Sequence, residues 1–473
     1  MMFEERRLHP AAIIFNILKV IKELFFSLLI VLVAGNFLIF SIALGAFSIL
    51  ASVYGILSWY RFSYYVTDDE LWIEYGIFKR TKRSIAKNRI QSIDLTESVI
   101  HRIFKLTRVQ IETASGGEKA EAALSAVSLK DAKELREVLK NSGKAGTLVL
   151  EEMYLAQKEI SFSRLLLAGI TSGGLGIIIG FIVVGLSEFD ELIPEMVYNY
   201  TYEWLVTASI IFIVLIILGV LAIIWLLSIL WTLLRYGKFT IRRTEDELFI
   251  TRGLLERKQL TIPLHRIQAI GIEENILRQP FGYAFIFAEI AGGNTDGKLA
   301  DSTILFPLLH KREIAAFLDE FAPDFSWQEE EVEWTKPPPA ALPYYYVRSS
   351  VLFLLASIAV FIFFRSFAWI PIALFALSLG LGWLSYKDAG FYLKGNRLLL
   401  RYRHVKRTTV LIQQKRIQAF EKKNHALERK WSLASMKISI LSNTGGKHYH
   451  VKNLEEEKVN QLGDRIAYRN KLE

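Results

Sequence analysis

The chain has 473 residues, of which 52% are hydrophobic, and its 57 Lys and Arg residues outnumber its 48 Asp and Glu residues. A chain this long and apolar excludes a single soluble domain and indicates several domains with membrane spans. It contains no cysteine, which excludes disulfides, thiolate metal sites and cysteine nucleophiles. The positive surplus suits nucleic acid or an anionic membrane surface. Because membrane spans are indicated, we expect a lipid surface and no nucleic acid.

The first apolar run, residues 24–59, contains no charged residue. A membrane span needs about 20 residues, so the run predicts two helices, a hairpin over residues 10–60 that turns at Gly35-Asn36. Short β-patterned segments follow, and they end in the amphipathic stretch Ser128–Leu139. Ser128 with Asp131 is typical of a helix N-terminus. Residues 61–142 therefore predict a small β-barrel or sandwich of antiparallel strands, plugged by a C-terminal helix.

A second hairpin is predicted over residues 160–235. Its two apolar runs, 165–186 and 205–234, flank a loop that contains five acidic residues and no Lys or Arg. Basic flanks stay in the cytoplasm. We therefore expect the acidic loop outside the cell, and both termini and every soluble domain inside it.

The soluble domain recurs twice. Residues 236–322 repeat 61–142. Over some 55 residues the offset is a constant 177, which pairs Phe104 with Phe281, and a further offset of 150 pairs Phe281 with Trp431. A gapless repeat of this length indicates duplication. An acidic, Pro-rich linker over 323–343 and a third hairpin over 344–386 precede the third domain, 387–473. That domain holds 20 Lys and Arg against 8 Asp and Glu. The predicted fold is six transmembrane helices plus three small β-rich domains.

Three patterns recur in these domains: a Tyr-rich strand followed by Asp-Glu-Leu, a Gly or basic bend, and the tripeptide Arg-Ile-Gln. The tripeptide occurs as Arg89-Ile90-Gln91, Arg266-Ile267-Gln268 and Arg416-Ile417-Gln418. With these patterns the chain resembles the bacterial pleckstrin-homology-like (bacterial PH domain) membrane proteins of the YdbS/YdbT group, most of all the YdbT type.

The resemblance implies that each domain is a strongly bent, seven-stranded antiparallel sheet closed by a C-terminal helix. It also implies a smaller, single-domain partner of the YdbS type, and a role in envelope stress and defence, including bacteriocin resistance. The third copy departs from the pattern, because Arg403 stands where the others have glycine. Its second hairpin is therefore expected to differ.

The Arg-Ile-Gln motif has two readings. The arginine could reach a lipid phosphate, or the motif could be structural, with isoleucine in the core and its neighbours satisfying backbone groups at a bend. Recurrence in diverging copies favours structure. Basic clusters could likewise be solvated faces or contacts to anionic lipid headgroups. The candidate lipid-contact residues are Lys79, Arg80, Lys82, Arg83, Arg401, Arg403, Lys406, Arg407, Lys415, Lys422 and Lys423.

A glycine seam lies on one predicted span, formed by Gly169, Gly173, Gly176 and Gly180. Small residues let helices approach closely in lipid, although glycine is also simply tolerated there. The seam favours helix packing, within this chain or in an oligomer.

No catalytic, cofactor or metal site is predicted, because phosphate-loop and nucleophile-elbow motifs are absent from the sequence. His448 and His450 share a strand face but have no further ligand beside them. Two functions remain open: a non-enzymatic scaffold that assembles with a partner, and a lipid-handling or peptide-exporting transporter. The uncharged predicted spans weaken the transporter.

Overall fold

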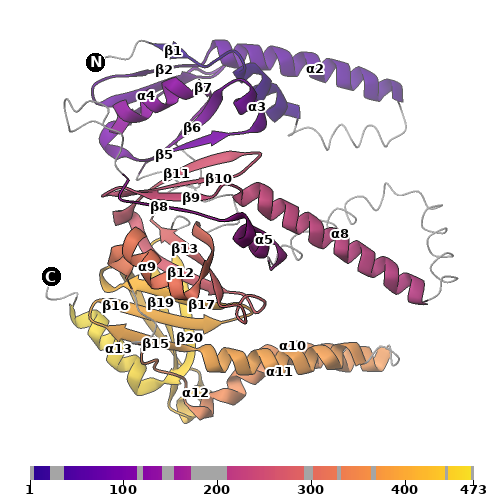
Figure 1. Ribbon diagram of the computed structural model, residues 1–473, viewed down its shortest axis with the longest axis vertical. Coiled ribbons are helices and arrows are strands. Elements are labelled where there is room, and N and C mark those ends of the chain that lie inside the picture. The colour runs from indigo at the N-terminus through magenta and orange to yellow at the C-terminus, as the bar shows by residue number, and fades with distance from the viewer. Residues whose placement is uncertain are drawn as a thin grey trace.

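The computed structural model describes residues 5–21, 37–113, 121–140, 154–171, 210–291, 302–326, 332–363, 369–442 and 446–469. These residues form three stacked units: unit 1 (5–140), unit 2 (154–326) and unit 3 (332–469). Helices extend from the same side of all three units (Figure 1). The predicted turn at Gly35-Asn36, the acidic loop 187–203, and Gly173, Gly176 and Gly180 lie outside the described residues.

Unit 1 begins with a helix over Ala12–Ile21 that packs beside a second helix, α2. Its elements are β1 (Arg6–Arg7), α2 (Phe37–Tyr60), β2 (Ser63–Val66), β3 (Glu70–Tyr75), β4 (Thr81–Ala86), η1 (Lys87–Arg89), β5 (Ile90–Glu97), α3 (Val99–Ile103), β6 (Leu106–Thr113), β7 (Ala122–Ser128) and α4 (Leu129–Lys140). The predicted closing helix is confirmed. The Asp131 N–H donates to Ser128 Oγ over 3.1 Å, and Leu135 and Leu139 are buried in the core.

Unit 2 repeats this order. Its elements are β8 (Ala156–Glu159), α5 (Phe162–Ile170), α8 (Ile210–Tyr236), β9 (Thr240–Arg243), β10 (Glu247–Arg252), β11 (Arg257–Pro263), η3 (Leu264–Arg266), β12 (Ile267–Glu274), β13 (Tyr283–Ile290), β14 (Thr303–His310), α9 (Lys311–Phe321) and η4 (Pro323–Phe325). Four phenylalanines, at 239, 306, 317 and 321, are fully buried between the sheet and α9.

Unit 3 comprises η6 (Pro339–Ala341), α10 (Leu342–Phe363), α11 (Trp369–Asp388), β15 (Gly390–Lys394), β16 (Arg397–Arg403), β17 (Arg407–Gln413), η8 (Gln414–Arg416), β18 (Ile417–Lys423), α12 (Ala426–Lys430), β19 (Leu433–Ile440), β20 (Lys447–Glu455) and α13 (Glu456–Arg469). Units 1 and 2 have the expected seven strands, β1–β7 and β8–β14. Unit 3 has six described strands. Thr335, which precedes them in the chain, forms a single antiparallel bridge with Phe391 of β15.

The units are not separate bodies, because their sheets run into one another. One seven-stranded sheet has the order β7-β6-β5-β11-β10-β9-β8, so strands of unit 1 continue into unit 2. A six-stranded sheet, β14-β13-β12-β17-β16-β15, joins unit 2 to unit 3 in the same way. The prediction that each domain has its own closed sheet is therefore corrected. Each unit contains two half-sheets, and the second half-sheet of one unit joins the first half-sheet of the next.

The prediction of six membrane-spanning helices is wrong for the described residues. By length and composition, one described helix is apolar enough to cross a membrane, over Leu218–Tyr236. The apolar helices Ala12–Ile21 and Leu44–Tyr60 are shorter. The start of α10 belongs to unit 3 instead of a span, because Tyr345 is buried there and its hydroxyl donates to the Lys452 carbonyl oxygen over 2.6 Å. A count of apolar residues could not distinguish helical turns that pack on a β-unit, such as the start of α10, from turns that face lipid.

Candidate membrane-contact face

Each unit exposes an apolar side chain at the tip of one β-hairpin. Phe78 lies between β3 and β4, Leu255 between β10 and β11, and Val405 between β16 and β17. The repeat offsets of 177 and 150 make the three positions equivalent. The relative exposure is 101% for Phe78, 52% for Leu255 and 55% for Val405. We call these three side chains the tip residues.

Glycine shapes the first two tips. Gly76 and Gly253 have φ angles of +111° and +100°, and a Cβ at either would lie 2.0 Å from a carbonyl oxygen, that of Lys79 or Glu256. Unit 3 has Arg403 there instead. Its hairpin differs as expected, because β16 and β17 pair as far as Arg403↔Arg407 and leave a three-residue loop. The Arg403 side chain turns inward, where its Nε donates to Asp388 Oδ2 over 2.5 Å.

A second exposed series follows the short turn after β5, β12 and β18. It consists of Phe104, Phe281 and Trp431, which are the equivalent aromatic positions of the three units. The next residue always has a left-handed backbone, with φ of 54° at Lys105, 68° at Gly282 and 53° at Ser432. This kink ends the turn and leaves the preceding ring outside the core. We call these rings the turn aromatics.

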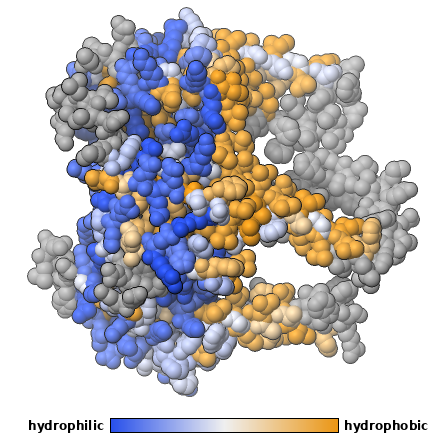
Figure 2. All heavy atoms as spheres, in the orientation of Figure 1, coloured by the Kyte–Doolittle hydropathy of each residue, from blue (hydrophilic) through white to orange (hydrophobic). Residues whose placement is uncertain are grey.

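Both series lie at the end of each unit where the helices leave. In unit 2 the Leu254 N–H donates to the Leu234 carbonyl oxygen of α8 over 2.9 Å. In unit 3 the Arg403–Asp388 pair joins the β16–β17 hairpin to the end of α11. Figure 2 shows hydrophobic residues gathered on the helix side of the molecule and hydrophilic residues on the opposite side. We call the helix side, with the tip residues and turn aromatics, the contact face.

Paired helices on this face meet at glycine in each unit. A Cβ at Gly55 of α2 would lie 3.0 Å from Ile17, one at Gly169 of α5 3.2 Å from Ile229 of α8, and one at Gly382 of α11 2.6 Å from Ser349 of α10. Close backbone approach at small residues is the usual way that helices pack in lipid. Of the predicted glycine seam, the structure thus places Gly169 against a helix of the same chain. Gly55 and Gly382 were missed, because neither has a second glycine at heptad spacing.

Many of the predicted basic lipid-contact residues are engaged within the protein. Arg80 and Lys82 both pair with Glu74, and the Lys82 hydrogen bond is the main cause that lowers the pKa of that carboxylate. The guanidinium of Arg83 donates to the Glu121 carbonyl oxygen. In unit 1 the tip residue's neighbour Lys79 is exposed, and the described residues offer it no ion pair.

The basic residues of unit 3 are divided in the same way. Arg401 lies 4.0 Å from the Trp334 ring centre, and Arg403 is buried. The remaining pairs are Lys406–Glu273, Arg407–Glu274, Lys422–Glu456 and Lys423–Glu421. Lys415 lies in η8 and lines a pocket at the unit 2–unit 3 junction. Most of these basic residues thus make contacts within their own unit, and Lys406 and Arg407 join unit 3 to unit 2.

The residues of the Arg-Ile-Gln motif occupy the crossing from the first half-sheet to the second. Each arginine ends a short 3₁₀ helix (η1, η3 or η8), and each isoleucine begins the following strand. A register shift then falls at the glutamine, between Ile90 and Ser92, Ile267 and Ala269, and Ile417 and Ala419. Ile267 and Ile417 are buried. Arg266 donates to the carbonyl oxygen of Ala291, and Arg416 to that of His265. These positions are those of a structural motif.

A basic pocket of about 430 Å³ opens between the first turns of α10 and the β18-β19-β20 sheet of unit 3. Its walls include Arg348, Lys423, Lys437, Lys452, His425 and His450. Its one carboxylate, Glu428, is buried and accepts hydrogen bonds from Asn453 Nδ2 (2.6 Å) and the His425 N–H (2.9 Å). Burial and then Arg348 lower the pKa of Lys452, and burial and then Lys452 lower the pKa of His450. The pocket is therefore electropositive.

Sequence reasoning found only Lys423 of this pocket. Lys437, His450 and Lys452 stand on the outer face of the β18-β19-β20 sheet, as strand alternation could have indicated. Arg348 comes from α10, however, and no sequence spacing brings it beside these strands. The tip residues and turn aromatics were also missed, although the offsets that align Phe104, Phe281 and Trp431 carried the signal.

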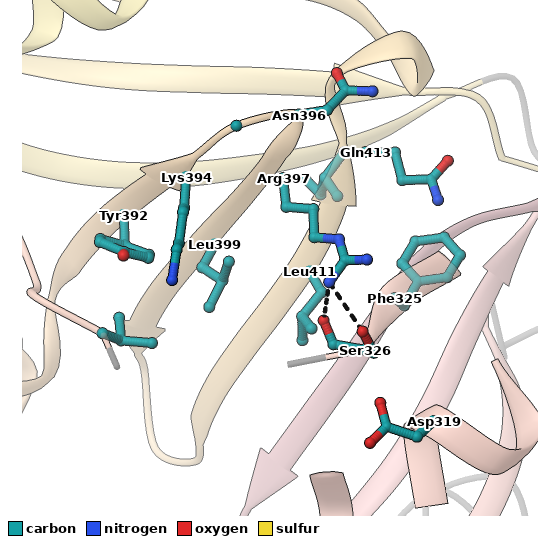
Figure 3. A pocket seen from close by; sticks show the side chains of 13 residues that line it. Asp319, Phe325, Ser326, Tyr392, Lys394, Asn396, Arg397, Leu399, Leu411 and Gln413 are labelled. Carbon is teal, nitrogen blue, oxygen red and sulfur yellow. Dashed lines mark hydrogen bonds between the residues drawn. The ribbon is translucent and has the colours of Figure 1, made fainter. Parts of the chain in front are cut away.

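A second cleft, of about 490 Å³, lies between units 2 and 3 at the β15–β16 turn (Figure 3). Its polar groups join the two units. Arg397 donates to the Ser326 carbonyl oxygen and, over 3.0 Å, to Ser326 Oγ, while Gln413 Nε2 donates to the Asp324 carbonyl oxygen over 3.0 Å. Because Arg397 and Gln413 already form hydrogen bonds between the two units, this cleft is part of the interface between units and not a candidate binding site.

Comparison with known proteins follows the same threefold division. The family profile described as Bacterial PH domain matches residues 14–142, 177–323 and 343–470. The chain is also similar to the UPF0699 transmembrane protein YdbT of Bacillus subtilis (strain 168). The two are 36% identical over 481 residues, which covers 97% of each chain.

Proposed function

The chain belongs to the bacterial PH domain family, of the YdbT type, and from this membership we propose that it is a non-enzymatic scaffold whose three units lie against the cytoplasmic surface of the bacterial membrane. It is a membrane protein, as its relative is. What remains to be argued is how the units meet the bilayer and what they do there.

The observation that carries the proposal is the threefold recurrence of the contact face. Each unit presents one tip residue and one turn aromatic on the side from which its helices leave. Aromatic side chains prefer the membrane–water interface, and burial of one large apolar side chain contributes roughly 1.5–3 kcal/mol. Because the units share sheets, the six side chains meet the membrane together and not one by one.

The basic pocket supports contact with anionic headgroups. Tyr344 and Arg348 form its α10 wall in the first turns of that helix, ahead of the apolar stretch from Val351. The exposed turn aromatic Trp431 follows α12, whose Leu427 carbonyl oxygen accepts a hydrogen bond from Tyr344 over 3.0 Å. Phosphate oxygens of phospholipids lie at this level of a bilayer, where each nearby Lys or Arg contributes about 1 kcal/mol.

The cytoplasmic placement rests on charge. Arg61, Lys238, Arg348 and Lys387 flank the helices on the side of the β-units, whereas the loop 187–203 contains no Lys or Arg. Positive flanks stay inside. Protection against membrane-active peptides such as bacteriocins, together with a smaller partner of the YdbS type, is the physiological part of the proposal, and its support is the family resemblance.

Single-cysteine probes test the contact face directly, because the natural chain has no cysteine. A fluorophore is attached to Phe78→Cys, Leu255→Cys or Phe281→Cys in lipid nanodiscs. The matched controls are Glu245→Cys and Asn396→Cys, which are exposed in the β9–β10 and β15–β16 turns. We expect spin-labelled lipid to quench the first three probes and aqueous iodide to quench the controls. If iodide quenches all five equally, the units do not touch the membrane.

The same control cysteines test the orientation. A membrane-impermeant maleimide should label Glu245→Cys and Asn396→Cys only after intact cells are permeabilised. Labelling before permeabilisation would place the units outside the cell. A flux assay in liposomes separates the scaffold from the alternative, a lipid-handling or peptide-exporting transporter, since a scaffold moves neither lipid nor peptide.

A further inference from the structure

The two junctions between units are built by the same rule. The first strand of the second half-sheet offers its outer edge, and the last strand of the next unit's first half-sheet pairs with it. At the first junction β5 pairs with β11, with Leu95 opposite Gln259. At the second, β12 pairs with β17 over six positions, from Ala269↔Ile412 to Glu274↔Arg407.

In unit 3 the corresponding strand is β18. It ends the sheet β18-β19-β20, and within the described part of the chain no strand pairs with its outer edge. Gln418, Ala419 and Lys422 are exposed on β18. By contrast, the equivalent Gln268, Ala269 and Ile272 of β12 are buried. The difference is the covering that the next unit gives to β12.

A groove of about 650 Å³ runs beside this edge, between β18 and α13. Ile417, Phe420, Gly463 and Ile466 are among its lining residues. In the first two units the closing segment and the edge strand together hold the incoming unit. In unit 1 the Arg136 guanidinium of α4 lies 4.7 Å from the Phe249 ring centre of β10. In unit 2 the Asp324 carbonyl oxygen of η4 accepts from Gln413 at the end of β17. Unit 3 presents the same two surfaces.

The charges of the strands distinguish the possible occupants. β17 pairs with β12 through Arg407–Ile412, where Thr408–Ile412 are uncharged and buried and Arg407 lies opposite Glu274. At the first junction Arg257 of β11 likewise lies opposite Glu97 of β5. By the same rule the described strand of this chain left to pair with β18 is β4, which carries the exposed Lys82 and Arg83. In the register of β17 on β12, Lys82 would lie opposite Lys422, and Arg83 opposite Glu421, which already pairs with Lys423 and Lys437. Lysine on an edge strand opposes edge-to-edge association, and like charges on neighbouring strands repel. A second copy of this chain is therefore a poor occupant.

We propose that the β18 edge and the β18–α13 groove bind a separate protein that contains a unit of the same fold, whose edge strand pairs as β11 and β17 do and has no basic residue opposite Lys422. The pairing is β-strand addition, in which main-chain hydrogen bonds give affinity and side-chain pockets give specificity. The inference rests on the proposed scaffold function and names its partner surface. It also orients the partner, because a unit added by this rule directs its own helices toward the same membrane.

A photo-crosslinking amino acid placed at Gln418 or Lys422 in living cells tests the inference, with His448 as the matched control. His448 is exposed in the same sheet on β20, away from the β18 edge. We expect crosslinks from 418 and 422, but not from 448, to one membrane protein with a bacterial PH unit. Peptide mapping should place those crosslinks on the edge strand of its first half-sheet. Ala419→Pro, which removes a strand N–H, should abolish them, while unchanged thermal unfolding in detergent shows that the variant folds.

Three results would overturn the proposal: crosslinks to β4 of a second copy, crosslinks to a protein without such a unit, or no crosslink at either edge position. Light scattering of the purified chain in detergent is the companion measurement, and we expect a monomer. None of these outcomes depends on lipid quenching of the tip probes, so the partner surface and the membrane contact can fail separately.

Discussion

The backbone N–H of Thr261 donates to Asp94 Oδ1 over 3.0 Å, although the two residues are 167 positions apart and belong to different units. Asp94 is buried at the β5–β11 junction, where Glu112 is close by. Burial and then the Glu112 charge raise the pKa of Asp94 to about 8. A protonated carboxyl group therefore lies at this joint near neutral pH.

This carboxyl group should make stability depend on pH. The folded pKa of Asp94 lies above its unfolded value, so the folded state binds the extra proton and stability falls as pH rises from about 4 to 8. Asp94→Asn resembles the protonated form and keeps an oxygen for Thr261. We expect it to raise the free energy of unfolding at pH 9, measured by thermal unfolding, by several kcal/mol, about 1.4 kcal/mol for each pH unit between the unfolded and folded pKa values, and to change it little at pH 4. The exposed Asp464→Asn is the control, and an equal effect at both pH values would contradict the assignment.

The second junction contains a buried ion cluster. Glu274 accepts from Arg407 over 2.6 Å and pairs with Lys311 over 2.7 Å. Glu274→Gln leaves two cations without their shared partner, so we expect the free energy of unfolding to fall by about 3–5 kcal/mol. Glu455→Gln, which removes one half of the exposed Glu455–Lys458 pair, should change it by less than about 0.5 kcal/mol. Denaturant titration of both variants in the same detergent measures the difference.

Gly253 should tolerate no side chain. Gly253→Ala places a Cβ about 2.0 Å from the Glu256 carbonyl oxygen at a φ of +100°, so we expect a loss of about 3 kcal/mol or more. Gly395→Ala is the matched control, because φ there is +60° and no atom lies within 4 Å of the added Cβ. It should cost about 1 kcal/mol. Equal losses would show that crowding at the Gly253 turn contributes nothing.

Phe78 should matter to the membrane and not to the fold. Its ring is fully exposed, so Phe78→Ser should leave thermal unfolding in detergent unchanged. In nanodiscs we expect Lys79→Cys to react with an aqueous maleimide about tenfold faster in the Phe78→Ser background, since one apolar anchor is lost. Asn396→Ser is the control background. Unchanged labelling after Phe78→Ser would remove this tip residue from the contact face.

Local patterns predicted local structure well. The constant offsets located the equivalent strands, Ser128 marked a real helix start, and Arg403 marked a hairpin that does differ. The failures concern tertiary pairing. The backbone hydrogen bonds that join β5 to β11 and β12 to β17 form between main-chain groups that every residue there carries, so the choice of residues does not reveal them. The apolar count also could not show that Tyr345 anchors α10 to unit 3.

For the candidate site, too, local features were predicted and long-range contacts were not. Basic clusters were visible as charge runs, but pairs such as Lys406–Glu273 join residues 133 positions apart and could not be found by spacing. The exposed rings Phe104, Phe281 and Trp431 were aligned by the repeat and still not recognised as a surface. An exposed and a buried aromatic residue are identical in sequence. Only the left-handed residue that follows each ring decides which way it points.

Because the sheets are shared between units, a strand of one unit is synthesised well before the strand that pairs with it. Leu95 of β5 leaves the ribosome 164 residues before its partner Gln259 of β11, an interval of about 10–30 s at usual translation rates. During that time the first unit carries an open hydrogen-bonding edge along β5. Nascent copies that meet in this interval can exchange strands, so chaperone occupancy of the growing chain should be highest between the emergence of β5 and that of β11.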